Sequence, residues 1–229
     1  MAITKNGSTF TGLVNALWAN NWTSASFAVG ANSNSILVVS VGVFLSAGLT
    51  DPCVTGVKWG GSGGTALTKL LSQTCNPTGT KELEASLWFL VAPTAQTSTL
   101  YLTFADSINE VQVSATVWDG AAQTTPFSGA VGGYNGWTTN HTITVSSATN
   151  SLVIDAINGG MVFTCSQTQD GNVSGSNSHL GQSNKAGAAS VVMTWTTASN
   201  YNHAMVAASL APYTGGGDHI NIALAVGGS

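Results

Sequence analysis

The chain has 229 residues, of which 43% are hydrophobic and only 6% are charged, and its formal net charge at pH 7 is −4. Arginine is absent and the five lysines are scattered singly, so sequence neighbours cannot form the basic patch that a nucleic-acid binder needs. High hydrophobicity combined with low charge is the reverse of a disordered composition. We therefore expect a folded protein that binds no nucleic acid.

The sequence also lacks membrane and export signals. The longest apolar-leaning run, 36–49, has 14 residues and is interrupted by serine and glycine, which is too short for a membrane helix. Residues 1–22 contain no continuous apolar segment and no cleavage pattern of a secretory signal. We expect no membrane partner, and either the chain does not use that export route or it begins at its mature end.

The periodicity predicts strands almost everywhere. Short runs rich in Thr, Val, Ser, Trp and Phe alternate with clusters of Gly, Asn, Pro and Ser, and no window has the apolar stripe of a helix. In chain order the predicted strands are 24–29, 35–45, 54–59, 66–73, 83–91, 99–104, 112–118, 141–145, 151–157, 161–165, 190–196 and 203–210. About a dozen strands with frequent turns predict an all-β protein, an antiparallel β-sandwich or barrel.

The strand 83–91 has apolar residues at its odd positions and Glu84 and Ser86 on the other face, which predicts one buried and one partly solvated face. Glu82 and Glu84 would lie about 7 Å apart, a separation that glycosidases use, although a solvated face is the favoured interpretation. The Gly/Ser-rich segment 170–187 is expected to be a long loop, either functional or, as favoured, a simple connection.

Two cysteines flank a predicted hairpin. The strands 54–59 and 66–73 enclose a Gly-rich turn, and if the hairpin is symmetric about Gly64, then Cys53 and Cys75 face each other at its open end. A Cys53–Cys75 disulfide is predicted on this basis, with two buried thiols as the equal alternative. Cys165 is expected to be a small core residue.

The sequence offers little machinery for catalysis. Asp155 lies inside an apolar strand, where it is either a buried group with a raised pKa or, as favoured, a solvent-facing or turn-capping residue. The four histidines have no metal-ligand spacing, and no nucleophile or phosphate-loop motif is present. We therefore predict no enzyme activity, no catalytic residues, no metal and no cofactor.

Aromatic residues provide the one feature typical of a binding site. Tyr134, Trp137 and His141 lie in an amide-rich segment that is expected to be a flexible loop, a mixture that stacks on sugar rings and hydrogen-bonds their hydroxyls. The favoured alternative is that Trp137 folds back as a plug at one end of the sandwich.

Six sequence segments follow one another along the chain in this order: TGVKWGG, ALTKL, ELEASLWFLVAP, VWDGAAQTTPFSG, SLVIDAI and ASVVMTWTTASNYNHAMVAASLAP. This order resembles a family of jelly-roll-like β-sandwich modules found in phage virion proteins and in bacterial secreted or surface proteins. The resemblance runs from about residue 26 to 212. It implies a jelly-roll-like sandwich and brings no catalytic residues.

The resemblance implies a non-catalytic structural protein of a phage particle, and we expect a capsid decoration or cement protein on the virion surface. Its partners would be other copies of itself and a major capsid protein, with contacts through shape-complementary surface. The alternative is a carbohydrate-binding or adhesion module, secreted or on a cell surface, with glycans as partners.

The C-terminal segment is predicted to be a separate strand. The expected domains are a sandwich over 1–213 and a Gly-hinged strand tail over 214–229. Ile220, Ile222, Leu224 and Val226 alternate with smaller or polar residues and form one aliphatic face. Such a strand must be covered, either by its own sheet or, as slightly favoured, by a neighbouring subunit in an assembly.

Overall fold

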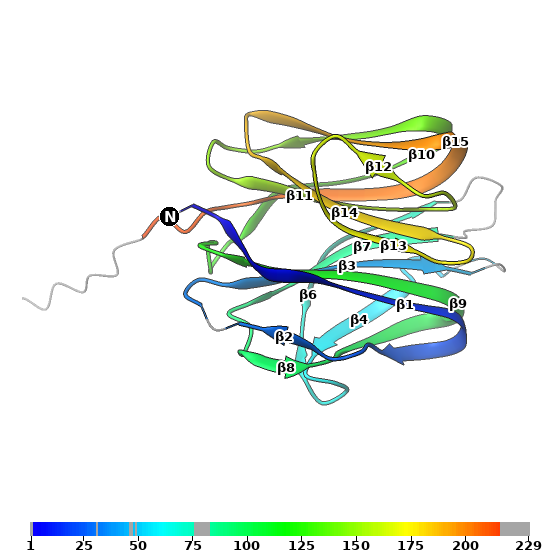
Figure 1. Cartoon of the computed structure of the whole chain (residues 1–229), viewed down its shortest axis with the longest axis horizontal. Helices are drawn as coiled ribbons and strands as arrows, with labels where there is room; N and C mark the ends of the chain where they lie inside the picture. Colours follow the sequence, from blue (N-terminus) through cyan, green and yellow to red (C-terminus); the bar gives the residue numbers. More distant parts are fainter. Residues whose placement is uncertain (1, 31, 46–47, 49, 76–82, 216–229) are drawn as a thin grey trace, which may run out of the picture.

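The computed structural model describes residues 2–30, 32–45, 48, 50–75 and 83–215. Within these residues all regular secondary structure is β-strand (Figure 1). The strands are β1 (Thr4–Thr23), β2 (Phe27–Val29), β3 (Ile36–Phe44), β4 (Val54–Trp59), β5 (Thr65–Ala66), β6 (Thr68–Cys75), β7 (Leu83–Val91), β8 (Gln96–Ser98), β9 (Leu100–Asp119), β10 (Phe127–Ser146), β11 (Leu152–Gly159), β12 (Thr164–Cys165), β13 (Thr168–Ser174), β14 (His179–Ala186) and β15 (Ser190–Leu210). These residues contain no helix that could span a membrane. The predicted all-β antiparallel sandwich is confirmed.

Two sheets form the sandwich. Sheet I has the order β5-β4-β9-β3-β7-β6, with β1 also paired to β9, and sheet II has the order β10-β15-β11-β14-β13, with β12 also paired to β15. Strand β9 is the centre of sheet I, because its first half pairs with β4, its second half with β3, and β1 runs along its other edge. A separate ribbon of β2 and β8 lies below sheet I in Figure 1.

Three apolar cores are stacked through the molecule. One lies below sheet I, includes Val41 and Val113, and is capped by aromatic residues of β1 and β2. The second lies between the sheets, where Leu87 of sheet I and Ile154 of sheet II belong to one cluster. The third contains Trp195. It is formed where the paired segments 140–146 of β10 and 190–196 of β15 fold back over the outer face of the rest of sheet II (Figure 1). Strands β3 and β11 and the second half of β9 are therefore buried on both faces.

The predicted element bounds are correct for β4 and β7 and differ elsewhere. The segments 99–104 and 112–118 are one strand, β9, and the segments 190–196 and 203–210 are likewise one strand, β15. Strand β1 was not predicted. The segment 170–187 is not a loop but most of β13 and β14 with the turn between them. Ser178 of this turn and Gln182 of β14 hydrogen-bond to polar side chains of β9.

The predicted solvated face of β7 is wrong. Glu84, Ser86 and Trp88 are all buried, because this face of sheet I covers the lower core. Glu82 lies outside the described residues, so the Glu82–Glu84 pair has no described geometry.

The predicted hairpin register is also wrong. Lys58 pairs with Ala66 and Trp59 with Thr65, so the pairing is centred two residues earlier than Gly64 and ends after two pairs. Beyond it, β6 leaves β4 and pairs with β7. Cys53 and Cys75 are both buried, in different cores, and the structure contains no disulfide between them. The structure therefore does not support the predicted Cys53–Cys75 disulfide. Cys165 is half-buried at the edge of the upper core.

The described chain ends beside its beginning. Pro212 pairs with Ala121, and the Tyr213 amide donates to the Gly120 carbonyl over 2.7 Å. Figure 1 shows the start of β1 and these last residues at the same end of the sandwich. Of the predicted strand tail, residues 216–229, with Ile220, Ile222, Leu224 and Val226, lie outside the described residues.

Candidate functional site

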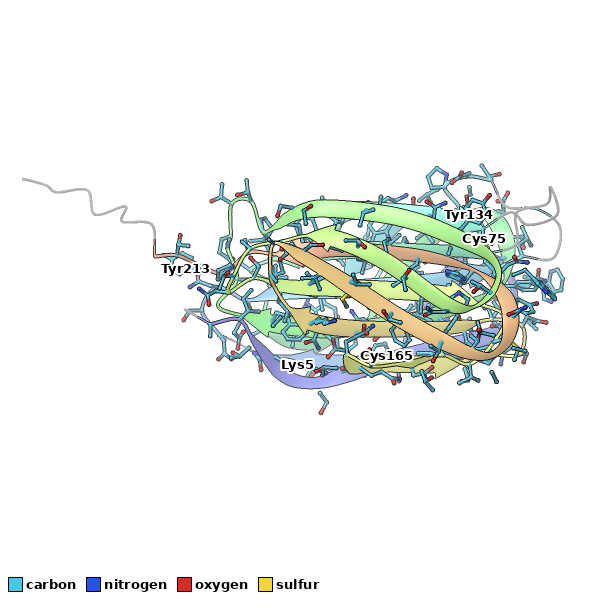
Figure 2. All side chains as sticks on the ribbon, turned by 90° about the horizontal axis from the view of Figure 1, so that it is seen from above. Lys5, Cys75, Tyr134, Cys165 and Tyr213 are labelled. Atoms are coloured by element: carbon cyan, nitrogen blue, oxygen red, sulfur yellow. The ribbon has the colours of Figure 1, made fainter. Side chains whose placement is uncertain are left out.

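The predicted aromatic loop is part of strand β10, and it presents aromatic rings to solvent. The side chain of Trp137 is 67% exposed, and it stacks on the half-exposed ring of Tyr201 from β15, with ring centroids 6.3 Å apart and planes at 29°. Trp137 is therefore not a plug. Tyr134 is also exposed and lies at the end of the molecule opposite Tyr213 (Figure 2).

The backbone holds Trp137 outward at an irregularity in the ribbon. Pairing between β10 and β15 shifts on both sides of Thr138, and Trp137 has a positive φ of 32°, which a bulky residue seldom adopts. The Trp137 amide donates to Oδ1 of Asn202 over 3.0 Å, which fixes this conformation. Strained backbone of this kind is found at binding and active sites more often than elsewhere.

His141, predicted as part of the same site, lies elsewhere. It is fully buried in the upper layer, where its ring is 3.7 Å from the ring of His203, centroid to centroid. Burial lowers the pKa of His141 to about 4, and burial together with His141 lowers that of His203 to about 3, so both rings are neutral near pH 7. His141 therefore cannot contact a ligand on Trp137.

Asp155 is buried, contrary to the favoured interpretation. Its carboxyl accepts hydrogen bonds from Ser183, through both the amide and the hydroxyl, and from Nε1 of Trp195 over 2.7 Å. Burial raises the pKa of Asp155 to about 7. These hydrogen bonds link β11 to its neighbours β14 and β15, and Asp155 does not line the pocket described below.

Glu84 is likewise a buried, hydrogen-bonded carboxyl, on the face of sheet I that covers the lower core. It accepts hydrogen bonds from the backbone amides of Cys53, over 2.5 Å, and Val54, over 3.3 Å, and burial raises its pKa to about 7. The other carboxylates in the described ranges also accept hydrogen bonds within the protein; they are those of Asp51, Asp106, Glu110, Asp119 and Asp170. Those ranges contain no group of three or more potential metal ligands.

The largest feature that sequence reasoning missed is a line of buried polar side chains between the sheets, which we name the polar seam. Its members are Ser40, Glu110, Gln112, Ser114 and Thr116 of sheet I with Asn158, Ser178 and Gln182 on the sheet II side, and all of them are buried. The alternation of polar residues along 110–116 was the available signal, but it is the same alternation that a solvated face produces.

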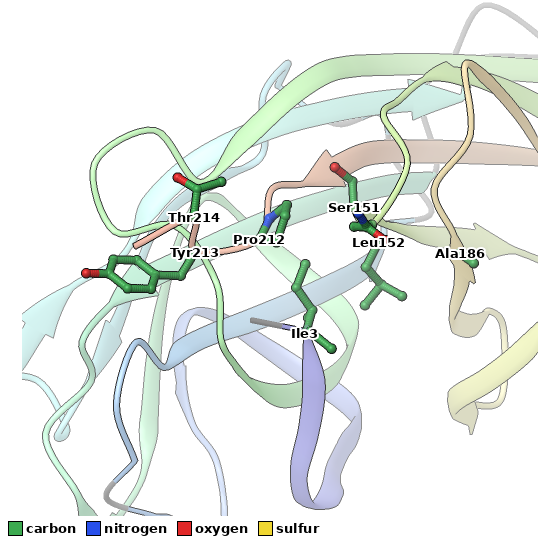
Figure 3. Close-up of a pocket in the computed structure, with 9 residues that line it drawn as sticks. Ile3, Ser151, Leu152, Ala186, Pro212, Tyr213 and Thr214 are labelled. Atoms are coloured by element: carbon green, nitrogen blue, oxygen red, sulfur yellow. The ribbon is translucent and has the colours of Figure 1, made fainter. Parts of the chain in front are cut away.

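A pocket of about 580 Å³ lies where residues 2–3 and 212–214 come together. Figure 3 shows Ile3, Leu152 and Pro212 grouped around it, with Tyr213 and Thr214 at its outer side. Its lining contains no acid, histidine, cysteine or lysine. The walls suit an apolar segment better than a reacting substrate.

Comparison of the chain with protein-family models, with curated proteins and with solved structures gave no match. Functional conclusions for this chain therefore depend on its own residues and geometry.

Proposed function

We propose that this chain is a non-catalytic structural protein that works through contacts between copies of itself and a larger shell, as a decoration or cement protein of a phage capsid does. The observation that carries the proposal is the mostly apolar pocket at the end where the described chain leaves the sandwich, since Thr214 is one of its walls. Directly after it, the sequence supplies a glycine-rich link and the aliphatic positions Ile220, Ile222, Leu224 and Val226.

The tail of a neighbouring copy is the proposed occupant of this pocket. An alternating aliphatic strand is unfavourable in water, and a pocket walled by Ile3, Leu152 and Pro212 offers it apolar surface. The carboxylates support the same proposal, because those in the described ranges take part in interactions within the protein, as structural groups do.

The test is deletion of residues 216–229, followed by sedimentation analysis of the full chain and the truncated chain. We expect the full chain to self-associate and the truncated chain to stay folded and monomeric. A matched variant, Leu224→Asp, should lose association, whereas the Asn221→Asp variant on the other face should keep it. A full chain that is monomeric at all concentrations would mean that the tail covers its own pocket, which would contradict the proposal.

The virion placement has its own test. A gene for this chain beside capsid, portal and terminase genes would support it, and purified particles should contain the protein in many copies. A gene within a cluster for polysaccharide degradation would favour the second candidate function.

That second candidate is carbohydrate binding, which the exposed pair of Trp137 and Tyr201 favours. Two neighbouring rings at a shallow angle, beside the amide of Asn202 and the hydroxyl of Thr138, resemble the platforms that stack on sugar rings. A glycan array should then show binding that Trp137→Ala abolishes. Trp18→Ala is the matched control, because Trp18 is equally exposed, at 64%, but lies on β1.

A further inference from the structure

One end of the polar seam brings a hydroxyl, a carboxamide and a carboxylate together in a dry environment. Glu110 and Gln112 lie two residues apart on the same face of β9, and Ser178 approaches them from the turn between β13 and β14. All three side chains are fully buried.

A single oxygen of Glu110 contacts both other groups. Its Oε1 accepts a hydrogen bond from Oγ of Ser178 over 2.8 Å and another from Nε2 of Gln112 over 2.7 Å. Its Oε2 is held by the backbone amides of Ser176 and Asn177, each over 3.0 Å. The carboxylate is therefore fixed between the hydroxyl and the amide nitrogen.

The carboxamide of Gln112 is oriented toward the same hydroxyl. Nε2 also donates to the carbonyl oxygen of Ser178, and since this carbonyl and the Glu110 carboxylate are both acceptors, the amide nitrogen must point toward them. The carbonyl oxygen Oε1 of Gln112 then lies 3.2 Å from Oγ of Ser178. The serine oxygen is thus beside the amide group that it would have to attack.

We propose that Ser178 and Gln112 are joined by an ester bond that the protein forms by itself, with Glu110 as the catalytic base. Oγ of Ser178 attacks Cδ of Gln112 while Glu110 takes the hydroxyl proton. The tetrahedral carbon then releases its nitrogen, which leaves as ammonia after receiving the proton from Glu110. One O–C bond forms, one C–N bond breaks, and Glu110 is regenerated.

The surroundings favour this reaction over hydrolysis. Holding the two groups in contact removes the entropic cost of bringing them together, and a buried ester is protected from water. Gly175 is required for the approach, because an added Cβ would lie 2.0 Å from Oε1 of Glu110 and 2.5 Å from Nε2 of Gln112. A covalent link between β9 and the β13–β14 turn would tie the two sheets together.

The same seam contains a matched pair without a carboxylate. Oγ of Ser114 donates to Oε1 of Gln182 over 2.6 Å, and Nε2 of Gln182 contacts Oγ1 of Thr116 over 3.4 Å. This serine and this glutamine are also buried. They have no base between hydroxyl and amide nitrogen, so the proposal assigns them no bond.

The test is the intact mass of the reduced full-length protein. We expect it to be lower than the mass calculated from the sequence by one ammonia, and digestion should yield one linked peptide pair containing Gln112 and Ser178 that hydroxylamine separates. Ser178→Ala and Gln112→Ala should restore the calculated mass. Ser114→Ala and Gln182→Ala should keep the ammonia loss.

Three results would overturn the proposal. The first is wild-type protein at the calculated mass, which needs no variant and so does not depend on folding of the substituted chains. The second is an ammonia loss that persists in Ser178→Ala, since it would have to come from another site such as the Asn158-Gly159 sequence. The third is a full ammonia loss in folded Glu110→Gln protein, which would exclude Glu110 as the base.

Discussion

The second half of strand β9 is buried on both faces, but the two faces differ in chemistry. From Val111 to Val117 the odd positions are aliphatic or alanine and pack in the lower core, while the even positions from Glu110 to Thr116 belong to the polar seam. The aliphatic face is stabilised by removal of apolar surface from water, which has no direction. The polar face is stable only where each donor meets an acceptor, so its geometry is far more exacting.

The difference shows why sheet II has to lie where it does. Glu110 accepts hydrogen bonds from three consecutive backbone amides, those of Ser176, Asn177 and Ser178. A shift of the β13–β14 turn by one residue would leave buried groups without partners. The polar face therefore fixes the register between the sheets, and the aliphatic faces supply most of the stabilisation.

The largest expected effect comes from removing the centre of the polar face. Glu110→Ala should lower the free energy of unfolding by more than about 3 kcal/mol, because it leaves several buried donors without an acceptor. Val113→Ala on the aliphatic face should cost about 2 kcal/mol, for lost burial and a small cavity. Urea unfolding of both variants measures their free energies of unfolding. A smaller loss of this free energy for Glu110→Ala than for Val113→Ala would contradict the comparison.

A crowding substitution in the seam should have the next largest effect. In Gly42→Ala the added Cβ would lie 2.9 Å from Cγ of Asn158, whose amide donates to the carbonyls of Val43 and Glu84. Displacing this amide should cost about 1–3 kcal/mol. Gly133→Ala is the control, because its Cβ would meet nothing within 4 Å, and thermal melting should show little change for it.

Buried titratable groups of sheet II should make stability depend on pH in two opposing directions. His203, with its pKa lowered to about 3, contributes stability above about 6.5 that is lost as the pH falls toward 3. Asp155, with its pKa raised to about 7, contributes stability below about 4 that is lost as the pH rises toward 7. Between pH 4 and 6.5 the two effects oppose each other.

Variants should separate these effects. As the pH rises from 4 to 6.5, the free energy of unfolding of His203→Gln should fall relative to that of wild type, because the variant lacks the contribution of His203. Over the same rise, that of Asp155→Asn should increase relative to wild type. Each change should be up to about 1 kcal/mol per pH unit. Val113→Ala should shift the whole profile without changing its slope. The free energy of unfolding of wild type and the three variants is measured against pH by urea unfolding. If all four profiles were parallel, the pKa values of His203 and Asp155 would not change on folding.

The smallest expected effect is the coupling within one pair of the seam. Ser114→Ala should cost about 1 kcal/mol by leaving Oε1 of Gln182 without its donor. The double variant Ser114→Ala, Gln182→Leu should cost less than the sum of the two single variants, by about 0.5–1 kcal/mol. Strict additivity in the double-mutant cycle would show that this hydrogen bond contributes nothing.

The candidate site was partly predictable. The composition of the segment 132–141 pointed to Trp137 and Tyr134, and both are exposed. Tyr201, the partner of Trp137, could not be found, because it is 64 residues further along the chain than Trp137 and is brought close only by the pairing of β10 with β15. His141 belongs to the same segment, but its side chain is buried, because the segment is a strand and not the expected loop.

Composition and period-two patterning determined by themselves that this chain is all-β, and they placed β4 and β7 with their observed bounds. Local propensity suffices for this, because aliphatic and β-branched residues favour strands wherever they lie. The tertiary structure alone decided which polar positions are buried. A glutamine or serine has the same pattern whether it faces water or a partner strand, and only the docking of sheet II on β9 supplies the partners that make its burial stable.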